Sequence, residues 1–502
     1  MTVTRRLLLG ALGTLPLARL AHGQVAHRLT VLHINDFHSR HEPVDGRAMG
    51  CSTGEGCFGG AARLVARIRA ERAAAEADGR TVLLLDGGDQ FQGSLFFTAH
   101  KGMAELAVQH AAGVDAMAAG NHEFDMGPAV LGRYAAAARF PVLSANVDAS
   151  GEPELRGRLH PYAVLERAGL RIGLVGLTPS ETLTSSSPGP RVRITDGGAA
   201  LPGAAAAARA DGAQLVIALS HLGVLRDATL AGAQVVVGGH SHTLLSNTER
   251  GALGPHPSVS RTGALVVQAG AYGRYLGRLD LDLAADGTVL AHGGDCIRVA
   301  LDTPEDPEVA AIVARFAEPL QAVRQEQVGV LPDGLGNETC RFQACPLGEL
   351  VAGVLLRAAQ GADVGLMNAG GLRTGLRPGP VTRGAVLDAL PFGNTLATLK
   401  LSGADLRAAL EYGLSMPGRG GFPQVAGLDW EWDPTRPAGA RITRIAVGGA
   451  PLDDGRLYGV ATHSFLRSGG DGYAVLRDRA VDPYDAGPGV ADLVADAAGR
   501  LP

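Results

Sequence analysis

The sequence predicts an α/β protein with two domains, and three observations indicate this class. Short apolar runs that are typical of buried strands alternate with Ala- and Arg-rich segments that are typical of helices. Several of these runs end in Asp, His or Asn beside glycine, which is more often than chance would give. With 502 residues, the chain is long for one hydrophobic core, so we expect two domains.

The first residues predict an export signal. Arg5 and Arg6 precede an apolar run that ends near Ala21 and Gly23. This pattern predicts a twin-arginine-type signal peptide over residues 1–26 and a periplasmic or secreted protein. A buried N-terminal helix is the alternative. The run is shorter than the ~20 residues that a membrane span needs, and no later segment qualifies, so we expect no transmembrane segment.

Charge and cysteine content narrow the class further. The net charge is −5 and the arginines form no basic run, which argues against a nucleic-acid partner. Two close cysteine pairs, Cys51 with Cys57 and Cys340 with Cys345, favour two small disulfide loops in an exported chain. A zinc site made of all four stays open, although neither pair has CxxC spacing. Cys296 has no evident partner.

The first predicted strand, residues 29–34, is mostly apolar and leads into the motif NDFH. Asp36 and His38 lie two residues apart, so in an extended strand tip both side chains leave the same side of the backbone. A carboxylate and an imidazole that converge there form a ligand pair for a divalent metal. His33, inside the strand, is expected to be a packed core histidine.

A helix over residues 60–77 and a second strand over 81–85 follow, and the strand opens into the motif DGGD. Its glycines let the backbone approach an ion closely, which favours Asp89 as a metal ligand. Asp86 is expected to act structurally by accepting hydrogen bonds from backbone amides.

The loop 120–127, GNHEFDMG, packs an amide, an imidazole and two carboxylates between glycines. Asn121 offers a hard, neutral carbonyl oxygen as a ligand, and Asp125 is placed to orient the ring of His122. The loop therefore predicts a metal site with an adjacent acid–base group, and an ordinary polar turn is the alternative.

Two further strands, over residues 214–219 and 233–237, lead into the motifs SHLG and GGHSH. The candidate metal ligands are then Asp36, His38, Asp89, Asn121, His221, His240 and His242. Seven ligands are too many for one zinc ion and suit two metal ions that share a carboxylate. Asp89 is the predicted bridge.

In this order, DxH, GGDxxxG, GNHEFD, SHLG and GGHSH resemble the motifs of calcineurin-like metallophosphatases, and GNHEFD with GHSH resembles the 5′-nucleotidase family more narrowly. The resemblance implies an N-terminal four-layer αββα sandwich with two zinc, manganese or cobalt ions. It assigns one ion to Asp36, His38, Asp89 and His242. It assigns the other to Asp89, Asn121, His221 and His240. His122 and Asp125 match the catalytic dyad, while His242 stands where relatives often carry Gln or Asn.

An amphipathic segment over residues 304–327 begins with proline and is the predicted linker helix between domains 27–303 and 328–502. Because related enzymes rotate their second domain, it is also a candidate hinge. In the second domain, Arg373 and Arg377 lie four apart in a Gly/Pro loop, where they can grip a phosphate or carboxylate. Solvated loop arginines are the alternative.

Phe422 and Phe465 lie in glycine-rich loops of a chain with only 4% aromatic residues, which predicts exposed platforms for a nucleobase. Taken separately, each ring would more often belong to the core. Both loops resemble the C-terminal substrate domain of 5′-nucleotidases. The resemblance assigns base stacking to the two Phe residues, ribose binding to Asp471 and a base contact to Asn394. His463 replaces an Asn of the family pattern.

Together these resemblances imply an exported phosphohydrolase that releases phosphate from nucleoside 5′-monophosphates such as AMP, with UDP-sugars or 2′,3′-cyclic nucleotides as further substrates. Both cysteine loops also resemble the paired cysteines of extracellular 5′-nucleotidases. Two alternatives remain. A thiosulfohydrolase of sulfur oxidation is disfavoured by GNHEFD and the Phe-bearing loops, and a catalytically dead nucleotide-binding module is disfavoured by the complete ligand set.

Overall fold

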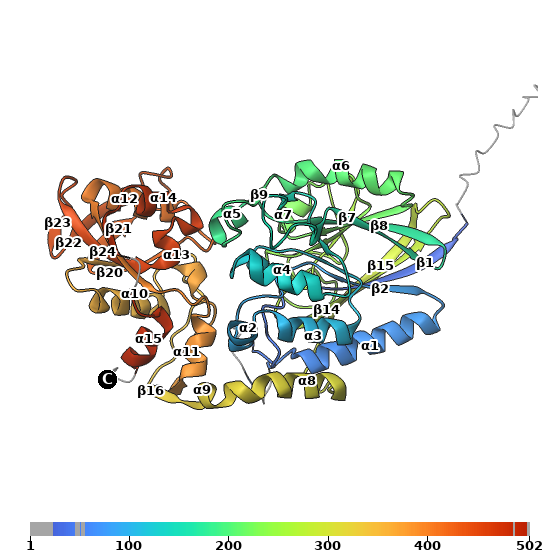
Figure 1. The fold of residues 1–502 in the computed structure, drawn as a ribbon, viewed down its shortest axis with the longest axis horizontal. Coiled ribbons are helices and arrows are strands. Elements are labelled where there is room, and N and C mark those ends of the chain that lie inside the picture. The colour runs from blue at the N-terminus through green and yellow to red at the C-terminus, as the bar shows by residue number, and fades with distance from the viewer. Residues whose placement is uncertain (1–23, 46–50, 52–55, 485–486, 499–502) are drawn as a thin grey trace, which may run out of the picture.

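The computed structural model describes residues 24–45, 51, 56–484 and 487–498. The predicted signal peptide, 1–26, falls almost entirely outside these residues. The helices and strands form an N-terminal group, blue to yellow in Figure 1, and a C-terminal group beside it, in orange and red. None of the helices in the described part combines the length and apolar character needed to cross a membrane.

The N-terminal part contains two mixed sheets. The first has the order β15-β14-β1-β2-β3-β4-β6, with β1, β2, β3, β4 and β6 parallel to one another. Its strands are β1 (His27–Ile34), β2 (Thr81–Asp86), β3 (Ala116–Ala118), β4 (Val142–Leu143), β6 (Leu159–His160), β14 (Tyr275–Leu283) and β15 (Val289–Arg298). The second has the order β12-β13-β11-β10-β8-β7. Its strands are β7 (Tyr162–Arg167), β8 (Leu170–Leu177), β10 (Leu215–Ser220), β11 (Val235–Gly238), β12 (Ser258–Val259) and β13 (Leu265–Val267).

Alternation along the strands places these sheets face to face. Val31 and Leu83 pack with Leu219 and Val237 of the second sheet, whereas Leu32 points to the opposite face. On that face lie α1 (Ala61–Ala77), α3 (Met103–Ala112), α4 (Pro128–Ala137) and α8 (Pro307–Ala317). Helix α6 (Gly197–Ala210) covers the outer face of the second sheet. The predicted four-layer αββα sandwich is confirmed.

Short elements complete the N-terminal part and lie mostly in loops between the strands of the two sheets. They are α2 (Leu95–His100), η1 (His122–Phe124), β5 (Val147–Asp148), α5 (Thr182–Ser185), β9 (Arg193–Ile194) and α7 (Val224–Asp227). His33 on β1 is fully buried, and its Nε2 lies 3.1 Å from His256 Nε2. It is therefore the packed core histidine that was predicted.

The segment 304–327 is not one continuous helix. Helix α8 is followed by η2 (Glu318–Leu320) and α9 (Gln321–Gln325). Pro319 lies in η2, and a proline inside a helix removes an amide donor and clashes with the preceding turn, which explains the tightened geometry there. This segment connects the two parts of the chain along one side of the molecule (Figure 1).

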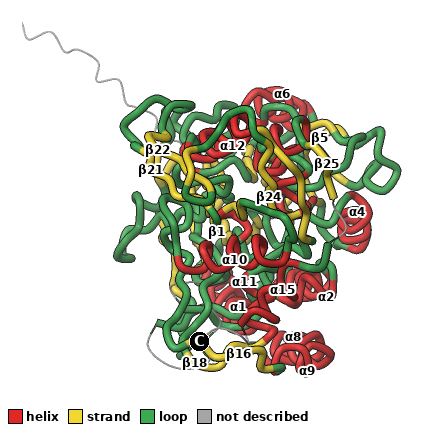
Figure 2. The backbone as a smooth tube through the Cα atoms, turned by 90° about the vertical axis from the view of Figure 1, so that its left-hand side faces the viewer, coloured by secondary structure: helices red, strands yellow, loops and turns green. Residues whose placement is uncertain are grey.

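The C-terminal part is built on a five-stranded sheet of order β20-β17-β24-β19-β25, with a three-stranded sheet β21-β22-β23 and a pair β16-β18. The strands are β16 (Gln327–Leu331), β17 (Val364–Asn368), β18 (Gly379–Thr382), β19 (Leu396–Ser402), β20 (Pro423–Ala426), β21 (Leu428–Trp432), β22 (Ile442–Val447), β23 (Ala450–Pro451), β24 (Leu457–His463) and β25 (Val481–Tyr484). Figure 2 views the molecule from this side, with β24 and α10 toward the viewer.

The helices of this part are short and surround the five-stranded sheet. They are α10 (Pro346–Ala358), η3 (Ala369–Gly371), α11 (Arg383–Ala389), α12 (Gly403–Leu414), α13 (Ser464–Arg467), η4 (Gly470–Gly472), α14 (Ala474–Asp478) and α15 (Val490–Ala498). Residues of α10, α12 and α15 share one buried apolar cluster with β17, β19 and β24.

The two predicted disulfides are present, Cys51–Cys57 and Cys340–Cys345. The alternative zinc site made of these four cysteines is therefore wrong. Cys345 also caps helix α10, because its sulfur accepts a hydrogen bond from Gly348 N at 3.2 Å. Cys296 is a buried free thiol.

Candidate active site

The seven predicted metal ligands lie at the carboxyl ends of parallel strands from both sheets. Asp36 and His38 follow β1, Asp89 follows β2, and Asn121 follows β3. His221 follows β10, while His240 and His242 follow β11. Parallel strands bring these ends to one edge of their sheet, which is why residues some 200 positions apart in the chain meet.

Five of the seven predicted ligands adopt a left-handed backbone conformation, with φ between 50° and 71°: Asp36, His38, Asp89, His240 and His242. The extended strand tip predicted for the first two is therefore wrong. The chain bends after β1 because Asp36 N donates to Gly88 O and His38 N donates to Asp89 O, at 2.9 and 3.0 Å. This conformation is unfavourable outside glycine, and its concentration in one place is typical of a functional site.

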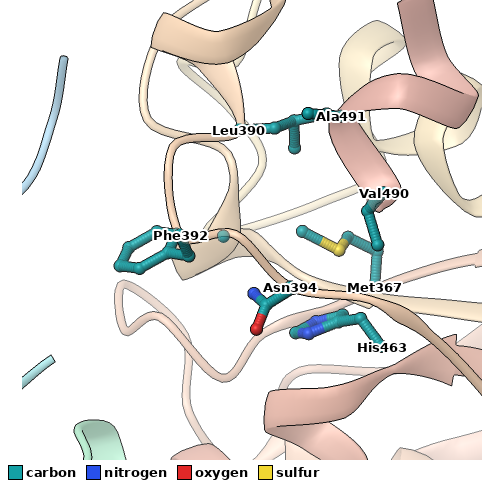
Figure 3. Close-up of a pocket in the computed structure, with 8 residues that line it drawn as sticks. Met367, Leu390, Phe392, Asn394, His463, Val490 and Ala491 are labelled. Atoms are coloured by element: carbon teal, nitrogen blue, oxygen red, sulfur yellow. The ribbon is translucent and has the colours of Figure 1, made fainter. Parts of the chain in front are cut away.

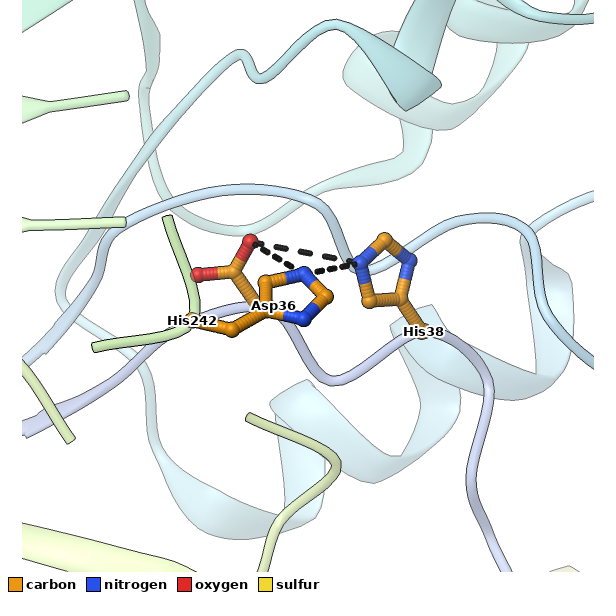
Figure 4. Close-up of side chains that lie close together, drawn as sticks. All are labelled: Asp36, His38 and His242. Carbon is orange, nitrogen blue, oxygen red and sulfur yellow. Dashed lines mark hydrogen bonds and ion pairs between the residues drawn. The ribbon is translucent and has the colours of Figure 1, made fainter. Parts of the chain in front are cut away.

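Asp36, His38 and His242 form the first group of converging ligand atoms (Figure 4). His242 Nε2 lies 3.3 Å from Asp36 Oδ1 and 3.0 Å from His38 Nε2. His38 Nδ1 can only donate to the carbonyl oxygens of Phe91 and Gln92, at 3.2 and 3.1 Å. Burial, followed by the charge of Arg373, lowers the pKa of His38 well below its usual value. Its Nε2 therefore presents a lone pair to this group, as a metal ligand must.

The second group consists of Asp89, His221 and His240, with Asn121 beside it. His221 Nδ1 donates to Gly87 O at 2.7 Å, which leaves Nε2 as the free ligand atom. The Nε2 atom of His221 is buried and lies 3.0 Å from Asp89 Oδ2, but the two atoms are not aligned for a hydrogen bond. Asn121 Oδ1 lies 2.9 Å from His240 Nδ1. A buried imidazole nitrogen that faces a carboxylate and an amide oxygen near a second imidazole fit a site built for a cation.

Asp89 lies between the two groups. Its Oδ2 is 3.0 Å from His221 Nε2 and 3.8 Å from His38 Nε2. A side chain at Gly120 would not fit, since a Cβ there would meet Asp89 Oδ1 at 2.2 Å. The geometry therefore suits the predicted role of Asp89 as a ligand shared by two ions.

His122 and Asp125 form a hydrogen-bonded pair at the rim of this cluster. His122 Nδ1 lies 2.6 Å from Asp125 Oδ2, and Ser186 Oγ donates to Asp125 Oδ1 at 2.7 Å. Burial disfavours the charged imidazole, but the carboxylates of Asp125 and Asp89 outweigh it and raise the pKa of His122. The pair can therefore present a protonated imidazole to an anionic group.

Two buried carboxylates fix the loops rather than offering ligands. Asp86 Oδ1 accepts from Gly88 N at 3.0 Å, the structural role that was predicted. Glu123 accepts hydrogen bonds from the backbone amides of Asp89, Gln90, Phe91 and Gly120. Burial and the charge of Asp89 raise the pKa of Glu123 to about 8. Sequence reasoning gave Glu123 no role, although its place inside GNHEFD, before the buried Phe124, was a usable signal.

The two arginines of the second domain do not act together. Arg373 Nη2 lies 3.2 Å from His38 Nε2, beside the first group of ligands. Arg377 Nη2 instead lies 2.8 Å from Asp45 Oδ2. The predicted joint grip is not formed, because a carboxylate of the N-terminal domain draws the second guanidinium away.

The two phenylalanines differ in exposure. Phe422 is only 1% exposed, and its ring packs edge-on against Trp432 at 5.8 Å. The prediction of an exposed platform is wrong for this ring. Strand β20 begins at the next residue, and Phe422 packs in the same buried apolar cluster as the core of this domain. Phe465 is half-buried and lies parallel to the ring of His463, 6.2 Å between centroids.

Asp471 and Asn394 have different neighbours near the end of β24. Asp471 Oδ2 accepts from Asn368 Nδ2 at 2.7 Å. Asn394 lines a small pocket with Phe392, His463 and other residues (Figure 3). The phenyl ring of Phe392 also lies 5.9 Å from the His122 ring, so this loop reaches the N-terminal cluster.

Sequence reasoning assigned no role to two further polar residues near Asp471. Asn368 contacts Asp471 directly, and Arg341 lies close enough to Arg373 and Asp471 for their charges to act on it. Arg341 belongs to the loop closed by the Cys340–Cys345 disulfide, and an arginine inside a disulfide loop was the available signal.

Comparison with known proteins agrees with this arrangement. The family model for calcineurin-like phosphoesterases matches residues 29–244, and that for the 5′-nucleotidase C-terminal domain matches residues 327–478. A snake venom 5′-nucleotidase from Naja atra is 34% identical over 489 residues, which is 89% of this chain and 92% of that protein.

A trifunctional nucleotide phosphoesterase of Bacillus subtilis (strain 168) is 33% identical over 500 residues. That match covers 90% of this chain, which spans about a third (32%) of the Bacillus protein. The solved structure of a 5′-nucleotidase precursor from Thermus thermophilus has 38% identity and a TM-score of 0.88, and covers 94% of this chain and 96% of its own. The chain therefore belongs to the 5′-nucleotidase family, with a calcineurin-like metallophosphatase domain followed by a 5′-nucleotidase C-terminal domain.

Proposed function

We propose that this protein is a metal-dependent 5′-nucleotidase that releases phosphate from nucleoside 5′-monophosphates such as AMP. One observation carries the proposal: the six other predicted ligands lie around Asp89, while Arg373 of the other domain reaches within 3.2 Å of His38 in the same cluster. A guanidinium beside a cluster of metal ligands suits an anionic phosphate ester. The family relationship supports the same activity.

The fold of a calcineurin-like metallophosphatase implies divalent metal ions, and we assign two, of zinc, manganese or cobalt. Asp36, His38, His242 and Asp89 would hold one. Asp89, Asn121, His221 and His240 would hold the other. When bound, such ions supply Lewis acidity toward the phosphoryl group and its attacking water. The donor set of carboxylate, amide and imidazole groups fits these metals.

The residues of the chain itself then position the substrate and stabilise charge. Arg373 binds the phosphate, and His122, held by Asp125, stabilises the charge on the transferring phosphoryl group. Phe465 offers a platform for the base, with Asn394 near it, and Asp471 accepts from the ribose hydroxyls. Phe422 anchors the loop that runs past Asp471, and Arg377 holds the two domains together through Asp45.

We further propose export and a hinge. Two disulfides are typical of proteins that fold outside the cytosol, which supports a signal over residues 1–26 and a periplasmic or secreted location. The segment 304–327 would act as the hinge for a rotation of the C-terminal domain, residues 328–502, against the domain 27–303. Such a rotation would have to break the pair of Arg324 with Glu42, 2.7 Å apart, and that of Arg377 with Asp45.

The test is phosphate release from AMP by protein stripped of metal and refilled with Zn²⁺, Mn²⁺ or Co²⁺, with UMP, UDP-glucose, ATP and 2′,3′-cyclic AMP as competing substrates. We expect metal-dependent hydrolysis of AMP. A clear preference for UDP-glucose or the cyclic nucleotide would reassign the substrate. If no nucleotide is hydrolysed with any of the three metals, the proposal is overturned and a thiosulfohydrolase or a binding module is favoured.

A further inference from the structure

His463 is a fully buried histidine at the end of β24 that has no role in the mechanism above. Its Nε2 lies 2.9 Å from Asn368 Oδ1, and Asn368 Nδ2 lies 2.7 Å from Asp471 Oδ2. A continuous hydrogen-bonded chain thus connects a buried ring to the carboxylate assigned to the ribose. Asn368 itself is 3% exposed, so its amide has little access to water as a substitute partner.

The direction of each hydrogen bond in this chain follows from the chemistry of its ends. A carboxylate can only accept, so Asn368 must turn its NH₂ group toward Asp471 and its oxygen toward His463. That oxygen can only accept, so the proton of His463 must lie on Nε2. Burial lowers the pKa of His463 to about 3, so the ring is neutral at pH 7 and Nδ1 carries no proton. Nδ1 has no hydrogen-bond partner among the described residues.

We infer that His463 is a positioning residue for the ribose site: its Nε2–H fixes the amide of Asn368, which in turn holds the Asp471 carboxylate toward the cis-diol of a ribonucleotide. This inference rests on the proposed function. Without the histidine proton, the buried oxygen of Asn368 has lost its donor, and the amide is no longer fixed in the orientation that holds the Asp471 carboxylate.

The adjacent geometry supports a specific place for this ring in recognition. Phe465, the proposed base platform, lies parallel to His463 with an interplanar angle of 7°. Asp471 has φ of 52°, which gives its backbone a conformation that side-chain contacts must help to hold. Tyr412 OH contributes one such contact to the Asp471 carbonyl oxygen at 3.2 Å. His463 thus lies behind both the base and the sugar positions.

The test compares AMP with 2′-deoxy-AMP, since only a held carboxylate gains from the second hydroxyl. For His463→Leu we expect the ratio of kcat/KM for the two nucleotides to fall about tenfold, through KM, the effect of losing one buried hydrogen bond. Hydrolysis of p-nitrophenyl phosphate, which lacks a sugar, should stay within about twofold of the wild type. In His463→Gln the side-chain amide can replace the Nε2–H, so this variant should keep most of the wild-type ratio.

Because leucine in this buried polar position can destabilise the domain, Asn368→Ala is measured in parallel and should lose the same ratio. An unchanged ratio in both variants, in a wild type active on AMP, would overturn the inference and leave the nucleotidase proposal standing. A wild type that is inactive on AMP would instead overturn the proposed function.

A second readout does not depend on activity. In protein labelled with ¹⁵N-histidine, with His463→Gln used to assign the resonance, Nε2 should carry the proton at pH 7. A proton on Nδ1 alone, or on both nitrogens, would contradict the hydrogen-bonded chain. The protonation state of His463 therefore tests the hydrogen bonds from His463 through Asn368 to Asp471 independently of any enzyme assay.

Discussion

The candidate metal ligands of the N-terminal domain and the proposed substrate-binding residues of the C-terminal domain are held in place by different means. Asp36 and Asp89 are buried, and each lies in the loop that follows a central strand of the sandwich. Backbone hydrogen bonds tie the two loops to each other, and the carboxylate of Glu123 accepts hydrogen bonds from the loop of Asp89. Asp471 and Phe465, by contrast, are partly exposed and depend on side-chain partners such as Asn368 and His463.

This difference indicates that the N-terminal domain is built for catalysis and the C-terminal domain for substrate recognition. A metal ion tolerates little displacement of its ligands, so the N-terminal cluster needs a support that the backbone itself provides. A nucleotide is held by several weaker contacts, each of which can change without loss of the others. We therefore expect substitutions in the first region to abolish activity and those in the second to change substrate affinity.

The largest effect should come from Asp89→Ala. Removal of the side chain proposed to bind both ions should lower kcat by a factor of about 10³ or more, since the Lewis-acid chemistry is lost with the ions. Metal content, measured by inductively coupled plasma mass spectrometry, should fall from two ions per chain to one or fewer. The control is Asp148→Ala, an exposed carboxylate on β5. Full metal content with full activity in Asp89→Ala would break the comparison.

The next effect should come from His122→Ala, which removes a side chain assigned to charge stabilisation and no ligand. We expect kcat to fall by about 10²–10³ with two metal ions retained, because proton donation and electrostatic stabilisation typically contribute this much. The matched control is His160→Ala, an exposed histidine on β6. Loss of metal together with activity would instead place His122 among the ligands.

Arg373 and Arg377 sharpen the comparison within the second region. Arg373→Ala should raise KM for AMP by about 10–100-fold, the range for losing a charge-assisted hydrogen bond. Arg377→Ala should change KM less than about threefold, because its ion pair with Asp45 is exposed. Initial-rate kinetics on the two variants decide this. Equal increases in KM for the two variants would indicate that Arg373 and Arg377 bind the phosphate together, as the sequence predicted.

The two phenylalanines should differ from each other, and their effect on KM should not exceed the lower end of that expected for Arg373. Phe465→Ala should raise KM for AMP by about tenfold, which corresponds to the ~1–3 kcal/mol of stacking on one base. Phe422→Ala should instead lower the free energy of unfolding by about 3–5 kcal/mol, since its ring is buried. Urea denaturation and KM measurements on both variants separate the roles. A stable Phe422→Ala protein with a raised KM would make this ring a platform after all.

The sequence predicted that the candidate metal ligands lie together better than it predicted the surroundings of the candidate substrate-binding residues, for a physical reason. Asp36, Asp89 and His221 each follow a buried strand within a few residues, so local patterns sufficed to place them. The position of Arg377 depends on Asp45, more than 300 residues away, and the burial of Phe422 depends on Trp432 on a neighbouring strand. No local pattern contains such partners.

The role of Glu123 shows a second limit of sequence patterns. Its motif was identified from the sequence. However, the carboxylate accepts hydrogen bonds from four backbone amides only because two loops meet around it, and no sequence pattern shows how those loops meet. The same holds for the left-handed backbone at Asp36, where an extended strand tip was expected. The α/β class, in contrast, was predicted from the alternation of apolar runs and helical segments, and the αββα layers from the family resemblance.

One measurement tests the central claim that Asp89 is shared by two metal ions in a nucleotide-cleaving site. It is the anomalous difference density, collected at the zinc absorption edge, of crystals grown with Zn²⁺ and a non-hydrolysable phosphonate analogue of AMP. We predict two peaks, one near Asp36 and His242 and one near His221 and His240, with Asp89 between them. A single peak, or two peaks with Asp89 bound to neither, would contradict the account.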